Sequence, residues 1–401
     1  MTQSKNYAAI EDTYGSGVFQ KYPLTVVRGS GASVWDVEGR EFIDCMAGYG
    51  VAITGHCNPW VVQAVKDQAE KLITCHGSFY NDARSEFLEK LTQVTPTGLN
   101  SALLTNSGTE SVEAAIKLAR RHTNKKKIIS MKGGFHGKTF GALSATWNKR
   151  YREPFGPLVP HFEFVEYGSA SALETALGDD TAAVIAEPVQ GETGVIVPPP
   201  DYLRAVRELC DKSGALLILD EIQTGLGRTG RMWASEHSGV IPDIMTVSKG
   251  LGGGLPIGAA IARREITQSM RKGEHTSTFA GNPLACAAAS ANLDFIVKNR
   301  LPEMAESKGK EMKSLLNGIA SRHKIAREVR GLGLMLALDL RVDLRQVLLD
   351  SLSRGVIFAY SGREVVRLLP PIIITEEQMR KSGEVLDEAV RLEGSRRYGG
   401  Q

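Results

Sequence analysis

An aspartate and a lysine end two strand-like segments of this chain and could act together. Asp220 ends the apolar run 215–219, and Lys249 follows the run 244–248 and precedes the glycine-rich segment 250–254. A buried carboxylate needs a cationic partner, such as a protonated pyridine nitrogen, because an isolated charge in apolar surroundings is expensive. Desolvation lowers the pKa of a buried lysine, and the neutral amine can form a Schiff base. The pair therefore predicts an enzyme that binds a cofactor.

A second group of residues could hold an anion. Ser107, Gly108 and Thr109 precede a segment whose apolar residues recur at helical spacing. Glycine lets an anion approach the backbone, the positive end of a helix attracts it, and the two hydroxyls can donate hydrogen bonds. The segment predicts either a phosphate site or an ordinary helix cap, and the residues alone leave both open.

Two glycine-rich segments suggest other functions. Residues 225–230 fit the G-x-G-x-x-G pattern of dinucleotide sites, but residues 220–224 separate them from the preceding strand. Residues 133–139 resemble the end of an ATPase phosphate-binding loop, with the strand that ends at Asp220 in the place of a metal-holding strand. The glycine that such a loop needs five positions before Gly137 is Lys132. An ATPase therefore stays only as an alternative from a different class.

The composition indicates a globular protein and excludes several classes. The chain has 401 residues and a formal net charge of +3, with 42% hydrophobic and 23% charged residues. These values do not fit a general nucleic-acid binder, a disordered chain or a fibre. The cysteines lack C-x-x-C spacing, the histidines lack metal-ligand spacing, and neither a signal peptide nor a membrane-spanning apolar run is present. We expect a cytoplasmic protein that binds no metal, nucleic acid or membrane.

The order of strand-like and helix-like segments predicts an α/β protein with two domains. Residues 46–285 alternate short apolar runs with helical periodicity, which favours a large domain with a mostly parallel sheet. Residues 1–45 indicate an amino-terminal arm or part of a small domain, and residues 286–401 indicate a smaller α+β domain. The small domain is expected to contain a strand pair or one long strand at 329–340.

Two local signals predict where helices begin. Thr375 to Gln378 have the spacing of a capping box, which predicts the start of the last helix. Asp201 follows three prolines and is expected to cap the helix after it.

Several separate motifs occur in the order typical of one enzyme family. These motifs occupy residues 106–110, 135–137, 187–192, 220–225, 248–250 and 277–283. Together with flanking segments from Gly29 to Pro371, they resemble the class III aminotransferases of the ornithine and acetylornithine type. The resemblance implies the fold-type I scaffold with a seven-stranded, mostly parallel sheet, pyridoxal 5'-phosphate as cofactor, and a homodimer.

The resemblance also implies how the cofactor is held. Lys249 would be the catalytic Schiff-base lysine and would carry the proton between substrate and cofactor, and Asp220 would keep the pyridine nitrogen protonated. Gln223 would bond the phenolic oxygen, and Phe135 would stack on the ring. The other cofactor-binding residues implied are His136, Glu187 and, at the phosphate, Ser107, Gly108 and Thr109. Thr278 of the partner subunit would also contact the phosphate.

Four further residues are implied to bind the substrate. Glu192 and Arg367 match a pair in which the glutamate covers the arginine until 2-oxoglutarate or glutamate needs it, although a structural ion pair is the alternative. Lys138 stands where the family usually has an arginine that grips a carboxylate, and lysine keeps the charge but loses the planar fork. Tyr49 aligns with a tyrosine that the ornithine enzymes use at the distal end of the substrate.

Within the family, three segments most resemble archaeal enzymes that act on lysine or ornithine intermediates attached to LysW, a small acidic amino-group carrier protein. Those segments are 144–155, 329–333 and 366–370. Lys149, Arg150 and Arg152 either suit such a carrier or are ordinary surface cations. We expect transfer of the terminal amine of a carrier-linked lysine or ornithine to 2-oxoglutarate, giving the semialdehyde and glutamate in lysine or arginine biosynthesis. Acetylornithine is the nearest alternative donor, followed by free ornithine or 4-aminobutyrate.

Overall fold

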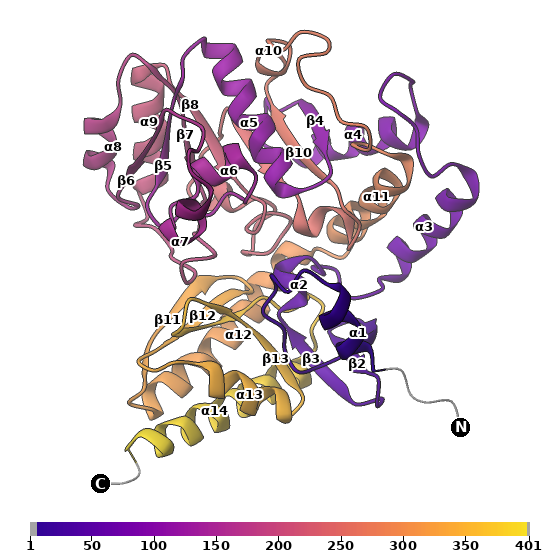
Figure 1. Cartoon of the computed structure of the whole chain (residues 1–401), viewed down its shortest axis with the longest axis vertical. Helices are drawn as coiled ribbons and strands as arrows, with labels where there is room; N and C mark the ends of the chain where they lie inside the picture. The colour runs from indigo at the N-terminus through magenta and orange to yellow at the C-terminus, as the bar shows by residue number, and fades with distance from the viewer. Residues whose placement is uncertain (1–5, 399–401) are drawn as a thin grey trace.

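The chain forms two seven-stranded sheets, each covered by helices, in a computed structural model that describes residues 6–398 (Figure 1). We call them the central sheet and the terminal sheet. The central sheet lies in the upper half of Figure 1 and comes from the middle of the chain. The terminal sheet lies in the lower half and combines strands from both ends of the chain.

The central sheet is mostly parallel, which confirms the prediction. Its strands lie in the order β4 (Ser101–Thr105), β10 (Gly258–Ala262), β9 (Ile244–Val247), β8 (Leu216–Asp220), β7 (Thr181–Ala186), β5 (Lys127–Met131) and β6 (Phe162–Val165). β10 runs antiparallel to both of its neighbours, whereas β9, β8, β7, β5 and β6 pair in parallel. All residues of β7, β8 and β9 are buried, as the continuous apolar runs of covered parallel strands require.

Helices cover both faces of the central sheet because successive strand residues point to opposite sides. Ile218 shares a hydrophobic cluster with helix α5 (Gly108–Thr123), whereas its neighbour Leu217 shares one with helix α9 (Tyr202–Ser213). The other helices of this half are α3 (Pro59–Lys71), α4 (Asp82–Val94), α6 (Phe140–Ala145), α7 (Lys149–Arg152), α8 (Ala170–Ala176), α10 (Arg264–Thr267) and α11 (Pro283–Lys298). Three short 3-10 helices are η1 (Glu153–Phe155), η2 (Ala234–His237) and η3 (Lys249–Gly252).

The terminal sheet joins the two ends of the chain. Its order is β1 (Val26–Ser30), β2 (Ser33–Asp36), β3 (Glu41–Cys45), β13 (Val356–Ser361), β14 (Val365–Leu368), β12 (Met335–Leu340) and β11 (Ala326–Leu332). β3 pairs in parallel with β13, which is how distant segments meet. The helices of this half are α1 (Tyr7–Tyr14), α2 (Ala47–Gly50), α12 (Leu301–Arg322), α13 (Arg345–Ser353) and α14 (Glu376–Tyr398). The α+β character expected of the smaller part is confirmed.

The described residues up to Cys45 divide between the terminal sheet and an exposed helix. Strands β1 to β3 belong to the terminal sheet, whereas α1 has no buried residue. The domain boundaries at 45/46 and 285/286 stay a prediction, and the second of these falls within α11. Among residues 6–398, no helix combines the length and apolar character needed to cross a membrane.

The two local helix signals had different outcomes. Thr375 and Gln378 form the expected capping box, because the Thr375 hydroxyl accepts from the Gln378 amide at 3.1 Å and the Gln378 side chain accepts from the Thr375 amide at 3.0 Å. The prediction for Asp201 was wrong in its chemistry. Asp201 occupies the position before α9 but makes no side-chain cap bond, because its carboxylate pairs with Arg204 instead.

Two glycines of α12 are expected to respond oppositely to alanine. A Cβ at Gly309 would overlap the backbone of Gly333, whereas one at Gly318 would meet only the flexible end of Arg322. Gly309→Ala should therefore lower the free energy of unfolding by about 2–3 kcal/mol, the usual cost of overpacking. Gly318→Ala should raise it by about 0.5–1 kcal/mol through helix propensity. Denaturant titrations measure both, and equal effects of the two variants would contradict the proposed packing.

Candidate active site

A cavity of about 330 Å³ lies where the parallel strands of the central sheet end. Phe135, Glu187 and Lys249 follow β5, β7 and β9, and Asp220 is the last residue of β8. Ligand sites of parallel sheets lie at this edge, because the strand ends and their loops converge there. The full lining consists of Tyr49, Gly108, Thr109, Phe135, His136, Gly137, Glu187, Glu192, Asp220, Ile222, Gln223 and Lys249.

Asp220 is buried and held by three donors. One carboxylate oxygen lies 2.7 Å from Nδ1 of His136, and the other accepts from the Thr246 hydroxyl and the Ile222 amide, each at 3.1 Å. The His136 ring is itself buried, and its Nε2 has no hydrogen-bond partner among the described residues. These contacts fix the carboxylate at the cavity wall, where it can stabilise a positive charge on a bound ring.

Lys249 combines burial with an unusual backbone. Burial lowers the pKa of its ammonium, against a smaller opposing effect of the Glu192 carboxylate. Its φ of 36° lies in the left-handed region, which costs a residue with a side chain of the order of 1–3 kcal/mol and is common at functional sites. The arrangement favours a neutral amine that can act as a nucleophile or a base.

The amino terminus of α5 forms another wall of the cavity. Gly108 and Thr109 line it directly, whereas the Ser107 hydroxyl caps α5 by accepting from the Glu110 amide at 3.4 Å. A Cβ on Gly108 would lie 2.9 Å from Cδ1 of Ile222, so the backbone here packs too closely against Ile222 for a larger residue. The cap is thus observed, and the free amides beside it can also bind an anion.

Gln223 and Glu187 supply further polar groups. The Gln223 side-chain oxygen is buried without a hydrogen-bond partner in the described chain, and its amide nitrogen donates to the Tyr49 carbonyl at 3.4 Å. The Glu187 carboxylate accepts from the amides of Phe135 at 2.9 Å and Gly191 at 3.0 Å. Burial raises the pKa of Glu187 to about 7. Glu187 therefore orders the Phe135 loop, while Gln223 leaves an acceptor for a ligand.

Arg367 lies buried on β14, close to Glu192. Its Nη2 is 2.8 Å from the Glu192 carboxylate, but this contact lacks hydrogen-bond geometry, because Nη2 has no hydrogen-bond partner among residues 6–398. Nε donates to the Tyr360 carbonyl at 3.0 Å and Nη1 to the Gly191 carbonyl at 3.1 Å. The guanidinium also lies 5.2 Å from the centre of the Tyr49 ring. Nε and Nη1 of the guanidinium are thus held by backbone carbonyls, whereas Nη2 makes only the ion pair with Glu192, which a ligand carboxylate can replace.

Four of the expected site residues are not among those that line this cavity: Ser107, Lys138, Thr278 and Arg367. Lys138 and Thr278 are both exposed. The Lys138 ammonium is 4.6 Å from the centre of the Tyr151 ring, and Tyr151 in turn meets Phe135 edge to face at a centroid distance of 6.0 Å. Lys138 is thus linked to the cavity through Tyr151.

Three neighbouring residues were missed by sequence analysis. Thr246 pairs with Asp220 across β8 and β9. Its hydroxyl within an otherwise apolar strand could have indicated a buried hydrogen-bond partner. Tyr360 meets Tyr49 edge to face at 6.5 Å through the pairing of β13 with β14, for which no local signal exists. Tyr151 lies in the basic segment of α7, whose charges drew attention instead.

Together these groups can hold a planar molecule that carries both a protonated ring nitrogen and a phosphate. Asp220 can face a protonated ring nitrogen, the Lys249 amine can reach a carbonyl, and the amides at α5 can bind a phosphate. In the described part of the chain, no group of three or more His, Cys, Asp or Glu side chains is placed to hold a metal ion.

Comparison with known proteins gives consistent matches over nearly the whole chain. The model of the aminotransferase class-III family matches residues 15–390. Acetylornithine aminotransferase from Methanopyrus kandleri is 49% identical over 96% of this chain and 98% of its own. LysW-aminoadipate semialdehyde/glutamate semialdehyde transaminase from Sulfolobus acidocaldarius is 43% identical over 92% and 95%. The crystal structure of ornithine aminotransferase from Toxoplasma gondii superposes with a TM-score of 0.95 at 33% identity, over 99% and 97%.

The raised pKa of Glu187 predicts a pH-dependent difference in stability between this chain and a Glu187→Gln variant. Because burial raises the pKa from 4.5 to about 7, the folded chain binds this proton more tightly than the unfolded chain. The contribution of Glu187 is therefore most favourable below about pH 4.5 and is lost as the pH rises to about 7.

Unfolding free energies of the cofactor-free protein measure this difference. Glu187→Gln should gain stability relative to the unmodified chain as the pH rises through that window, and exposed Glu89→Gln controls for the loss of one charge. A constant difference across the window would contradict the burial of an ionisable carboxyl group.

Proposed function

The chain belongs to the class-III aminotransferase family, and we propose that it transfers the terminal amine of a carrier-linked lysine or ornithine to 2-oxoglutarate. An aminotransferase of the acetylornithine or LysW-aminoadipate semialdehyde type is the broader assignment that the relatives carry. The family depends on pyridoxal 5'-phosphate and has the fold-type I scaffold. No support is left for the ATPase alternative.

The observation that carries the reaction is the meeting of Asp220, Lys249 and the start of α5 at one cavity. The residues fit pyridoxal 5'-phosphate: Asp220 suits the ring nitrogen, the unpaired oxygen of Gln223 suits the phenolic hydroxyl, and the free amides at the start of α5 suit the phosphate. When bound, this cofactor draws electrons from the amine-bearing carbon of the substrate and makes its proton acidic.

The chain's own residues then move that proton and hold the reacting groups. Lys249 would hold the cofactor covalently in the absence of substrate and would then act as the base that takes and returns the proton, a role that needs the neutral amine that burial favours. Asp220, fixed by His136, keeps a positive charge on the ring nitrogen. Phe135 bounds the ring face, and Ser107, Gly108 and Thr109 orient the phosphate.

Glu192 and Arg367 act in this proposal as a gate between the two substrates. The ion pair with Glu192 occupies Arg367 while the amino donor binds. The terminal amine of the donor, rather than a carboxylate, then lies at the Arg367 end of the cavity. A dicarboxylate competes with Glu192 for the guanidinium, whose other two corners stay on backbone carbonyls. One cavity can thus serve both halves of a ping-pong cycle.

Lys138 is assigned to the carboxylate of the donor. Its ammonium is a point charge over the Tyr151 ring, so it can meet a carboxylate from several directions but cannot form the two parallel bonds of an arginine. Tyr49, whose ring contacts both Arg367 and Tyr360, is assigned to the distal end of the donor.

A homodimer and an acidic carrier are the partners we propose. Phe79, Tyr80 and Phe279 are exposed, and Arg84 ties their two loops together by donating to the carbonyls of Phe79 at 3.0 Å and Gly281 at 2.7 Å. Such an ordered aromatic surface favours burial against a second subunit, where Thr278 would complete the neighbouring phosphate site.

The carrier part of the proposal is supported by the similarity to a LysW-linked enzyme and by the cationic face of α7. Lys149 and Arg150 on this helix are exposed and lie beside Tyr151 in sequence, so they can attract an acidic protein toward the Lys138 side of the cavity. The cytoplasmic location stays a prediction.

Replacement of Lys249 tests the reaction itself. Lys249→Ala should fail to develop the visible absorbance that lysine-bound pyridoxal phosphate gives, and its kcat should fall about 10²–10⁴-fold or more, because it loses both anchor and base. Exposed Lys126→Ala is the matched control and should behave like the unmodified protein. An unchanged spectrum of Lys249→Ala would remove the assignment.

Comparison of amino donors tests the substrate. With 2-oxoglutarate as acceptor, kcat/KM for carrier-linked lysine or ornithine should exceed that for acetylornithine by at least about tenfold, which is about 1.4 kcal/mol of transition-state binding. Free ornithine and 4-aminobutyrate should rank below both. A clear preference for free ornithine would refute the carrier part of the proposal while leaving the reaction class intact.

A further inference from the structure

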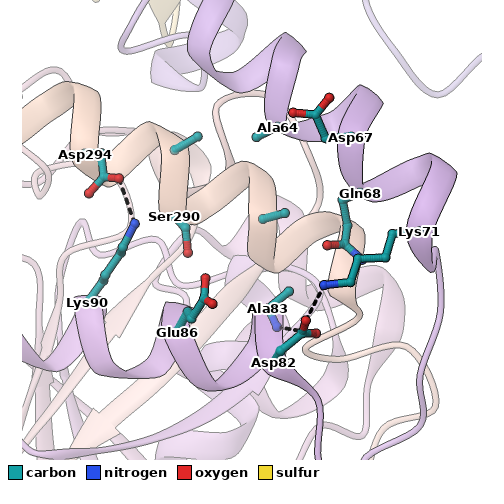
Figure 2. Close-up of a pocket in the computed structure, with 12 residues that line it drawn as sticks. Ala64, Asp67, Gln68, Lys71, Asp82, Ala83, Glu86, Lys90, Ser290 and Asp294 are labelled. Carbon is teal, nitrogen blue, oxygen red and sulfur yellow. Dashed lines mark hydrogen bonds and ion pairs between the residues drawn. The ribbon is translucent and has the colours of Figure 1, made fainter.

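A second hollow shares no residue with the active-site cavity and lies in a groove between α3, α4 and α11 (Figure 2). Its volume is about 360 Å³. The groove forms because small side chains of three adjacent helices meet there. The complete lining consists of Ala64, Asp67, Gln68, Lys71, Asp82, Ala83, Glu86, Lys90, Ala287, Ser290, Ala291 and Asp294.

The groove carries an excess of negative charge. Its lining contains four carboxylates and two lysines, so its formal charge is two minus four, or −2. Lys71 is paired with Asp82, and Lys90 pairs with Asp294 at 2.7 Å. Two carboxylates are left without a cation among residues 6–398.

Those two carboxylates stand on different helices. Asp67 on α3 accepts only from the neutral amide of Gln63, at 2.6 Å, and Glu86 on α4 has no ion-pair partner within the described residues. The groove thus presents, from its two sides, two exposed carboxylates that form no close ion pair in the described chain, although Lys71 also acts on Glu86 at longer range. This arrangement favours a ligand with two or more positive charges.

Ser290 adds an unpaired group at the floor. Its side-chain oxygen is buried without a hydrogen-bond partner in the described chain, and the residue is only 8% exposed. A serine within a helix usually bonds the carbonyl four residues earlier, but here the hydroxyl faces the Glu86 carboxylate across the groove (Figure 2). An unpaired buried hydroxyl is costly, so a ligand that supplies its partner is favoured.

Gln68 completes a set of acceptors. Its amide nitrogen donates to the Leu72 carbonyl at 2.8 Å, which leaves the side-chain oxygen for the groove. Carboxylates, a hydroxyl and an amide oxygen surround a floor of alanines. A primary ammonium has three donors and one positive charge, and an aliphatic chain suits the alanine floor.

We propose that this groove is a binding site for an aliphatic polyamine, with one primary ammonium held by Glu86 and Ser290 and another by Asp67. A small anion is disfavoured by the charge of −2, and a bare metal ion by the absence of a ligating cluster in the described chain. The polyamine bridges α3 and α4 and stabilises the folded enzyme by binding it.

Titration of the holoenzyme with spermidine tests the site. Calorimetry should give saturable binding that weakens as salt is added, and spermidine should raise the melting temperature beyond sodium chloride of equal ionic strength. The neutral 1,5-pentanediol should have no such effect. Equal stabilisation by sodium chloride would overturn the proposal.

Variants locate the binding. Glu86→Gln should weaken spermidine binding about two- to fivefold, because an ion pair of an exposed carboxylate contributes up to about 1 kcal/mol, whereas Glu89→Gln, which changes an exposed glutamate of the same helix outside the lining, should not. Ser290→Ala should weaken binding several-fold while leaving the melting temperature of the free enzyme unchanged or higher, because it removes an unpaired hydroxyl. Binding that Glu86→Gln leaves as tight as in the unmodified protein, including binding in the active site, would refute the groove as the site.

Discussion

The hydrogen bond between His136 and Asp220 is the contact on which the active site depends. At 2.7 Å and fully buried, it places a carboxylate at the centre of the central sheet, where desolvation opposes its charge. The Thr246 hydroxyl and the Ile222 amide support the other oxygen. Donors from the loop after β5, from β9 and from the turn after β8 therefore converge on one side chain. This convergence requires the strand order of the sheet.

The end of the cavity proposed for the substrate is built differently, because it lies where the two sheets meet. Arg367 comes from the terminal sheet, whereas Glu192 and the Gly191 carbonyl come from the loop after β7 of the central half. Arg228 joins the same two parts by donating to the carbonyls of Leu334 at 3.1 Å and Pro370 at 2.6 Å. The end of the cavity proposed for the cofactor thus rests on one sheet, while the end proposed for the substrate depends on the junction between two.

This difference explains what could be predicted from the sequence. Asp220 and Lys249 follow apolar runs whose burial is a local property, so their place at the cavity could be predicted. Asp201 was misassigned because a side-chain competitor, Arg204, decides its partner. Tyr360 reaches the site only through the pairing of β13 with β14 and with the distant β3, and no local pattern encodes such pairings. Lys138 was expected at the cavity, yet its contact with it runs through Tyr151.

Buried polar groups without hydrogen-bond partners indicate where ligands can bind, provided that a cavity lies beside them. The Gln223 oxygen borders the active-site cavity and the Ser290 hydroxyl borders the groove between α3, α4 and α11. Each carries a desolvation cost of about 1–3 kcal/mol, which a ligand with a matching donor removes. Arg228 also has unpaired nitrogens but lines neither hollow, and its two carbonyl contacts already link the halves of the molecule. A buried polar group without a hydrogen-bond partner therefore indicates a ligand where it borders a cavity. Where packing encloses it on all sides, it indicates a structural role.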